Sequence, residues 1–106
     1  MSLFSFLGLG NNKLKDALRR GAIIVDVRSP GEFDSGKIPD SLNIPVDRIP
    51  INAERLKAMQ RPIIFCCSSG HRSNQAVQYM AGKGAKELYN GGNWHRLLRI
   101  VNSLNY

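Results

Sequence analysis

An apolar run at Ile63–Cys67 limits the fold of this chain more than any other stretch. Such a run is typical of a strand that is covered on both faces of a parallel sheet. Small and basic residues follow it, and a helix is predicted to begin at Ser73, after a turn over residues 67–72. In α/β proteins, ligands bind where such strands end and helices begin. The layout therefore marks Cys67 as the candidate reactive residue.

The rest of the chain alternates between short strands and short helices. A second apolar run, Ala22–Val27, predicts another buried parallel strand, and shorter strands are expected over residues 41–45 and 86–89. A turn at Asn90–Gly92 is expected to follow the last of these strands. Helices are expected over residues 11–20, 29–33, 51–59, 73–81 and 94–101. In the third of these helices, the apolar candidates are Ile51, Leu56 and Met59. This alternation predicts an α/β protein with a largely parallel sheet.

Length and composition indicate one globular domain. The chain has 106 residues, of which 42% are hydrophobic and 22% are charged, as in an ordinary water-soluble protein. Its two cysteines are adjacent in sequence and make a poor disulfide framework. We therefore expect a reducing compartment, the cytoplasm.

The net charge of +7 bears on the class of partner. Such a charge suits nucleic acid, an acidic protein or a small anionic substrate. The basic residues are scattered, without the alternating aromatic residues that single-strand binders need. We expect an anion-attracting site and no nucleic-acid partner.

Residues 1–11 form an apolar N-terminal segment, ahead of a domain expected at residues 12–106. The segment lacks the features of a signal peptide and is too short to span a bilayer. We expect an edge strand or a segment packed on the domain; a membrane partner is not expected, and anchoring is the alternative. Asn11 or Asn12 then caps a helix that Gly21 ends.

The loop after the central run offers three devices that favour a thiolate at Cys67, the reactive form of the residue. The following helix supplies free N–H groups and the positive end of its dipole. Small residues let successive N–H groups turn inward as an anion nest, and a histidine and an arginine add donors. The candidate substrate-binding residues are Ser68, Ser69, Gly70, His71, Arg72 and Ser73.

The neighbouring cysteine is expected to be inert. Cys66 still lies within the apolar run, and adjacent residues of a strand face opposite ways. A metal site made of Cys66, Cys67, His71 and His95 is conceivable, but this spacing matches no zinc pattern. We therefore expect Cys66 in the core, no metal and no cofactor.

The loop Cys67–Ser73 resembles the active loop of rhodanese-family sulfurtransferases, whose single-domain members read Cys-x-x-Gly-x-Arg-Ser. Three further stretches resemble the family's D-V-R…E-F/Y, G-H-I-P-G-A…N-I-P and L-x-G-G-x-x-x-W signatures. These stretches are Val25–Arg28 with Glu32 and Phe33, Gly36–Pro45, and Leu88–Trp94. They follow the family's order and extend the resemblance over about residues 12–100.

The chain departs from the family pattern in places that concern turns more than chemistry. Lys37 and Asp40–Ser41 stand where the family has histidine and Gly-Ala, and Trp94 comes one residue early. The resemblance implies a three-layer rhodanese-like fold with a mainly parallel, five-stranded sheet flanked by helices. It also implies that Cys67 carries sulfane sulfur as a persulfide held by the loop amides.

The mechanism expected from this resemblance is a double displacement with ping-pong kinetics. Cys67 takes sulfur from thiosulfate or a related anion and gives it to cyanide, a thiol or a protein acceptor. Arg72 and His71 are expected to orient the anionic donor. Asp26 and Arg28 are expected to support the structure as a charged pair, with Glu32 as a further partner of Arg28.

Two alternatives remain open at this point. One is a cysteine phosphatase or arsenate reductase of the same superfamily, whose loops hold one more residue between cysteine and arginine. Only four residues separate Cys67 from Arg72, which favours sulfur. The other alternative is a binding module or a sulfur relay that serves a partner protein. The retained cysteine argues against a mere binding module but not against a sulfur relay.

Overall fold

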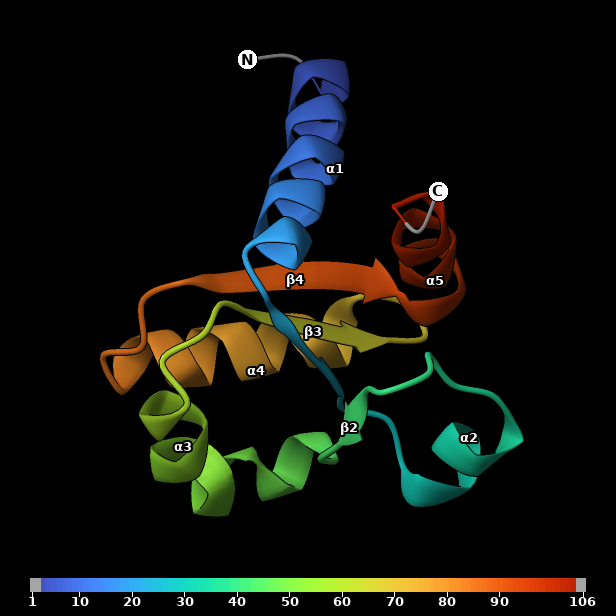
Figure 1. Cartoon of the computed structure of the whole chain (residues 1–106). Helices are drawn as coiled ribbons and strands as arrows, with labels where there is room; N and C mark the ends of the chain where they lie inside the picture. Colours follow the sequence, from blue (N-terminus) through green and yellow to red (C-terminus); the bar gives the residue numbers. More distant parts are fainter. Residues whose placement is uncertain (1–2, 105–106) are drawn as a thin grey trace.

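The computed structural model describes the backbone of residues 3–104 and the side chains of residues 11–104. Helices and strands alternate along it (Figure 1). In chain order they are α1 (Leu3–Arg19), β1 (Ile23–Asp26), α2 (Pro30–Ser35), β2 (Leu42–Asn43), the 3-10 turn η1 (Val46–Arg48), α3 (Ile49–Ala58), β3 (Ile63–Cys67), α4 (His71–Gly82), β4 (Leu88–Asn93) and α5 (Trp94–Ser103).

The strands form one parallel sheet in the order β2-β1-β3-β4. The predicted parallel α/β architecture is thus confirmed. The part of the chain that the structure describes contains four strands rather than the expected five. In the register of β1 and β3, Asp26 lies beside Cys66, so the two strands end together at one edge of the sheet. The candidate site residues therefore meet at that edge.

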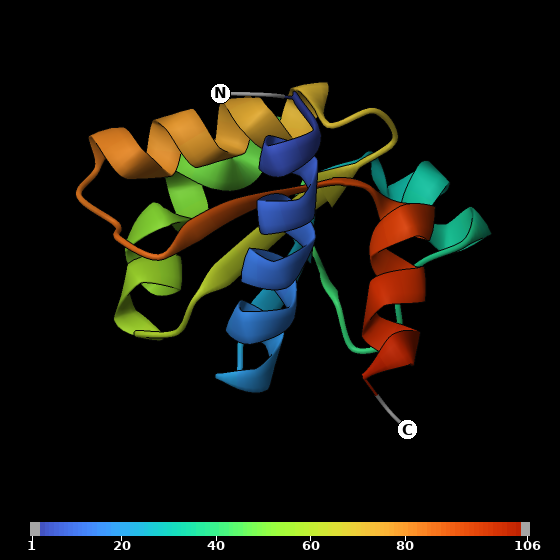
Figure 2. The ribbon, with the colours of Figure 1, turned by 90° about the horizontal axis from the view of Figure 1, so that it is seen from above.

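Helices cover both faces of the sheet and give the three layers that were predicted. α3 and α4 lie on one side, and α1 and α5 lie on the other (Figures 1 and 2). All of β3 is buried, and its side chains alternate between the two sides. Phe65 and Cys67 pack with residues of α3 and α4, while Ile64 and Cys66 pack with residues of α1 and α5. The two cysteines therefore face opposite layers, as predicted.

The first helix begins earlier than expected. α1 starts at Leu3 rather than at Asn11 or Asn12, so the predicted edge strand is wrong, and the predicted boundary at residue 11 lies inside a continuous helix. Gly21 follows the helix with φ +87°, a left-handed conformation that glycine adopts without strain, as predicted. The side chains of residues 3–10 lie outside the described part. No helix in the described part is both long and apolar enough to cross a membrane.

Two predicted details of the other helices are wrong. α3 begins at Ile49, and its buried face consists of Ile49, Ala53 and Leu56. Ile51, predicted as an apolar contact, is 79% exposed, because it lies two residues, or about 200°, around the helix from Ile49.

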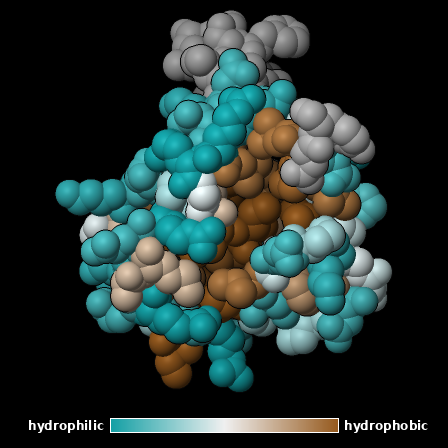
Figure 3. All heavy atoms as spheres, in the orientation of Figure 1, coloured by the Kyte–Doolittle hydropathy of each residue, from teal (hydrophilic) through white to brown (hydrophobic). Residues whose placement is uncertain are grey.

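On the face shown in Figure 3, apolar residues gather between α1 and α5, with hydrophilic residues around them.

Candidate active site

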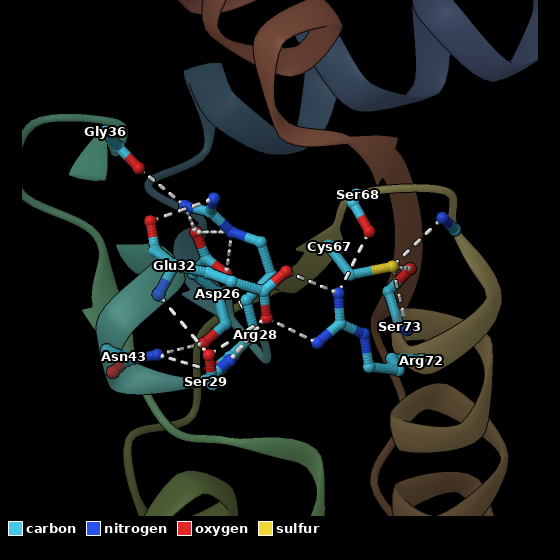
Figure 4. Close-up of polar contacts among 11 residues, drawn as sticks. Asp26, Arg28, Ser29, Glu32, Gly36, Asn43, Cys67, Ser68, Arg72 and Ser73 are labelled. Carbon is cyan, nitrogen blue, oxygen red and sulfur yellow. Dashed lines mark hydrogen bonds and ion pairs between the residues drawn. The ribbon is translucent and has the colours of Figure 1, made fainter. Parts of the chain in front are cut away.

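Cys67 ends β3, and the loop Ser68–Gly70 joins it to α4 (Figure 4). The helix begins at His71, two residues before the predicted start, and the Asn74 N–H donates its first helical bond to the Gly70 carbonyl at 3.0 Å. Gly70 has φ +93°, which brings its N–H group back toward the strand end. The loop is therefore a tight cradle at the N-terminus of a helix.

The sulfur of Cys67 lies inside this cradle. The Gly70 N–H donates to Sγ at 2.9 Å, and the Ser73 N–H donates at 3.4 Å. The Ser73 hydroxyl oxygen lies 3.4 Å from the sulfur. The predicted anion nest is thus formed around Cys67 by the backbone of Gly70 and of the first turn of α4.

These contacts set the charge state of the thiol. Burial alone raises the pKa of Cys67, but the Ser73 hydroxyl and the N–H groups of Ser73, Ser69 and Gly70 act against burial. Their hydrogen bonds hold the pKa of Cys67 below its ordinary value. Burial raises the pKa of Cys66, which has no such donors among the described residues and is a neutral core residue. Cys67 is therefore the more reactive of the two thiols.

Cys67 is nevertheless fully buried, with 0% of its surface exposed. Two asparagine amides hold the loop over it. Asn90 Nδ2 donates to the Gly70 carbonyl at 3.0 Å, and Asn93 Nδ2 donates to the Ser68 carbonyl at 2.7 Å. A molecule that reacts with the sulfur therefore requires the loop to shift or the Cys67 side chain to rotate.

The Arg72 side chain does not face the sulfur; it extends toward α2 (Figure 4). Its Nη1 and Nη2 donate to the two carboxylate oxygens of Glu32 at 2.7 and 3.1 Å, and Nη2 also donates to Ser68 Oγ at 2.9 Å. The hydrogen bonds from Arg72, and after them those from Ser29, lower the pKa of Glu32 to about 2. Glu32 was expected to pair with Arg28, and this prediction is wrong for its carboxylate.

Asp26 and Arg28 form the buried pair that was predicted. Arg28 Nη2 lies 2.7 Å from Asp26 Oδ2, and the two side chains are 5% and 0% exposed. Arg28 also donates to the Gly36 carbonyl at 2.6 Å and to the Glu32 carbonyl at 3.2 Å, and its guanidinium lies 4.5 Å from the centre of the Trp94 ring. Arg28 therefore fixes the backbone of the segment that carries Glu32.

A capping box places the Glu32 carboxylate. The Ser29 hydroxyl accepts a bond from the Glu32 N–H, and the Ser29 N–H donates to Glu32 Oε1 at 3.0 Å. Ser29 is therefore the N-terminal cap of α2, and Pro30 lies in its first turn. The carboxylate is thereby held where it meets Arg72.

The remaining loop residues have clear positions. The Ser69 hydroxyl accepts the His71 N–H at 3.3 Å, and the His71 side chain is exposed. Asn90 and Asn93 are the site residues that the sequence analysis missed. Their only signal in the sequence is an asparagine on each side of Gly91–Gly92. The stretch Asn90–Gly92 was interpreted as a turn, whereas the structure shows that it is part of β4.

Comparisons with known proteins agree with this geometry. The profile of the rhodanese-like domain family matches residues 11–94. A sulfurtransferase of Allochromatium vinosum is 37% identical over 68 residues, which are 64% of this chain and 63% of that protein, just under two thirds of its length. A thiosulfate sulfurtransferase GlpE of Pseudomonas syringae is 36% identical over 74 residues, 69% of each chain.

A solved structure of a rhodanese-like domain protein from Staphylococcus aureus has the same fold, with a TM-score of 0.67 and 30% identity. The match covers 82% of this chain and 86% of that one. The similarity therefore extends over most of the sheet and its helices as well as over the motifs.

Proposed function

Because the chain belongs to the rhodanese-like domain family, we propose that it is a sulfurtransferase that carries sulfane sulfur on Cys67. The observation that supports this most is the sulfur itself. Sγ lies at the end of β3 and accepts N–H groups from Gly70 and Ser73, and its pKa is lowered. A thiolate held by backbone donors is a nucleophile, and the same donors stabilise a persulfide anion.

The first half-reaction loads the sulfur. The Cys67 thiolate attacks the outer sulfur of thiosulfate and forms a new S–S bond. The original S–S bond of thiosulfate breaks, and sulfite leaves with the electron pair. The product is a persulfide on Cys67, and the loop N–H groups face the charge that it carries.

The second half-reaction returns the enzyme to its starting state. Cyanide or a thiolate attacks the outer sulfur of the persulfide, and the S–S bond to Cys67 breaks. Cyanide leaves as thiocyanate, whereas a thiol, free or on a protein, leaves as a persulfide. The Cys67 thiolate is regenerated, and the cycle uses no resident metal or cofactor.

The surrounding charges have separate roles in this proposal. Arg72 is held by Glu32 and Ser68, so it positions the loop and adds a nearby positive charge. The exposed His71, together with the net charge of +7, attracts and orients the anionic donor. Both cysteines are free thiols, which suits a reducing compartment, and we place the protein in the cytoplasm.

The direction of Arg72 also argues against a phosphatase or an arsenate reductase. An oxyanion of phosphorus or arsenic in the loop needs the guanidinium as a bidentate donor. Here Glu32 takes both terminal nitrogens. Hydrolysis of an aryl phosphate that is abolished by Cys67→Ser would contradict the choice of sulfur.

The direct test mixes the protein with thiosulfate and cyanide and measures thiocyanate. Cys67→Ala is expected to reduce turnover to background, because no other described thiol has donors around it. Cys66→Ala is the matched control and is expected to keep most of the activity. Activity that survives Cys67→Ala and is lost in Cys66→Ala would overturn the proposal.

A further inference from the structure

The hydroxyl of Ser73 lies between two different neighbours. Its oxygen is 2.6 Å from Asn90 Oδ1 and 3.4 Å from Cys67 Sγ. A serine hydroxyl carries a single proton and therefore donates one hydrogen bond at a time. Which neighbour receives that proton decides whether Ser73 favours a thiol or a thiolate at Cys67.

The orientation of the Asn90 amide answers this question for the resting site. Asn90 Nδ2 donates to the Gly70 carbonyl at 3.0 Å, and Asn90 Oδ1 accepts the Gly92 N–H at 2.9 Å. A flipped amide would place NH₂ against the Gly92 N–H and oxygen against the Gly70 carbonyl, two repulsive contacts. The atom that faces Ser73 is therefore an oxygen, which only accepts.

It follows that the Ser73 proton is donated to Asn90. The oxygen of Ser73 then presents a lone pair to Sγ, where it accepts the S–H of a neutral thiol and repels a thiolate. The backbone N–H groups of Gly70 and Ser73 favour the thiolate in either orientation. Within the cradle, the Ser73 hydroxyl is the donor whose direction can change.

We propose that Asn90 is a positioning residue that holds the Ser73 hydroxyl away from Cys67 in the resting state, and that the hydroxyl turns to the sulfur when the thiolate forms. In this step the S–H bond breaks and the proton passes to water. The O–H bond rotates from Asn90 Oδ1 to Sγ, and Oδ1 keeps the Gly92 N–H. The role in thiolate chemistry rests on the proposed function, but the hydrogen-bond exchange does not require a sulfur donor.

The exchange is energetically reasonable. A hydrogen bond to a charged sulfur is stronger than a bond to a neutral amide oxygen, so turning toward the thiolate is favourable. The free energy gained in this way is reduced by that of the hydrogen bond to Asn90, which breaks when the hydroxyl turns. The bond to Asn90 therefore leaves the pKa of Cys67 higher than it would be without this acceptor, although it still lies below its ordinary value.

Other ionisable groups near the sulfur do not replace this control. Asp26 is paired with Arg28 and Glu32 with Arg72, so the two carboxylates are neutralised in pairs. Cys66 faces the opposite layer. The other ionisable residues on α4, β4 and α5 are His71 and Tyr79 on α4, Tyr89 on β4, and His95, Arg96 and Arg99 on α5.

The test measures the pH dependence of Cys67 alkylation by iodoacetamide, with the modified peptide quantified by mass spectrometry. Asn90→Ala removes the acceptor, and we expect the midpoint of the profile to fall by about half a pH unit, the equivalent of one neutral hydrogen bond. Asn90→Asp keeps an acceptor and adds a negative charge, so its midpoint is expected to rise. Asn90 is exposed, so neither change disturbs the core.

Both variants lose the amide bond to the Gly70 carbonyl, which separates the two roles of Asn90. A looser loop changes the maximal alkylation rate in both variants alike, whereas the midpoints are expected to move in opposite directions. In a Ser73→Ala background, Asn90→Ala is expected to leave the midpoint unchanged.

Three results would overturn the inference: an unchanged or raised midpoint in Asn90→Ala, a lowered midpoint in Asn90→Asp, or the same Asn90→Ala shift without the Ser73 hydroxyl. Thiocyanate formation by the wild-type protein is measured in parallel. If turnover is normal and the midpoints do not move, only the role of Asn90 is contradicted. If turnover is absent and the midpoints shift as expected, only the proposed sulfurtransferase activity is contradicted.

Discussion

The carboxylate of Glu32 and the guanidinium of Arg72 connect α2, the helix after β1, to the first turn of α4. Their two hydrogen bonds, of 2.7 and 3.1 Å, are bidentate, a geometry that fixes direction as well as distance. Ser29 holds Glu32 from the other side through the capping box. The capping box of α2 therefore acts, through Glu32 and Arg72, on Ser68 in the loop around Cys67.

The depressed pKa of Glu32 gives this pair a defined pH dependence. Its pKa is about 2 in the folded protein and 4.5 ordinarily, so the pair stabilises the fold fully above pH 4.5 and loses its effect as the pH falls toward 2. Glu32→Gln is expected to lower the unfolding temperature at pH 7, with a difference from the wild type that narrows between pH 4.5 and pH 2.

The control for this experiment is Asp34→Asn on the same helix, since Asp34 forms no ion pair among the described residues. Thermal unfolding followed by circular dichroism measures both variants. A constant difference between Glu32→Gln and the wild type over the whole pH range would refute the pairing.

The buried pair at the end of β1 contributes more to stability. Asp26 and Arg28 are almost fully buried, and removing one partner leaves an uncompensated charge. Asp26→Ala is expected to lower the free energy of unfolding by about 3–5 kcal/mol, as measured by urea denaturation at neutral pH. A loss below about 1 kcal/mol would show that water replaces the pair without cost.

Among the elements, β4 differs most from its prediction. The sequence suggested a strand over residues 86–89 and a turn at Asn90–Gly92, but the strand runs from Leu88 to Asn93. Its register with β3 shifts after Asn90, so that Gly91 is the extra residue of a bulge. The bulge places Asn90 and Asn93 against the loop Ser68–Gly70. No local pattern in the sequence predicts this bulge.

Close packing explains the glycine at the bulge. A Cβ on Gly91 would lie 2.8 Å from Ile64 Cγ2 and 3.2 Å from the Phe65 carbonyl oxygen. Gly91→Ala is therefore expected to destabilise the fold by about 1–3 kcal/mol in urea denaturation.

The control is Gly31→Ala on α2, where a Cβ meets nothing within 4 Å. This change is expected to be neutral or to stabilise by up to about 1 kcal/mol. If the two substitutions had equal effects, the contact of β4 with β3 would not be the cause.

On the scale of the whole molecule, features with a strong local pattern were predictable. The apolar runs identified β1 and β3, and the nest of small residues identified Cys67. The features that were missed depend on contacts between distant segments: the Arg72–Glu32 pair spans 40 positions and the bond from Asn93 to Ser68 spans 25. Ile51 shows the same limit, because its exposure depends on where α3 begins.

The whole fold also explains why we expect only one of the two adjacent thiols to react. The pleat of β3 sends Cys66 into the layer of α1 and α5, and the loop to α4 surrounds Cys67 with donors. Both are buried, so exposure does not distinguish them. The difference is the cradle at the carboxyl edge of the sheet.

Mass spectrometry after incubation with thiosulfate tests this difference most directly. In the Cys66→Ala variant, we expect the peptide that contains Cys67 to gain the mass of one sulfur atom and to lose it on addition of cyanide. In the Cys67→Ala variant, we expect no gain. Sulfur found on Cys66, or no sulfur on a folded Cys66→Ala protein, would contradict the assignment of Cys67 as the sulfur carrier.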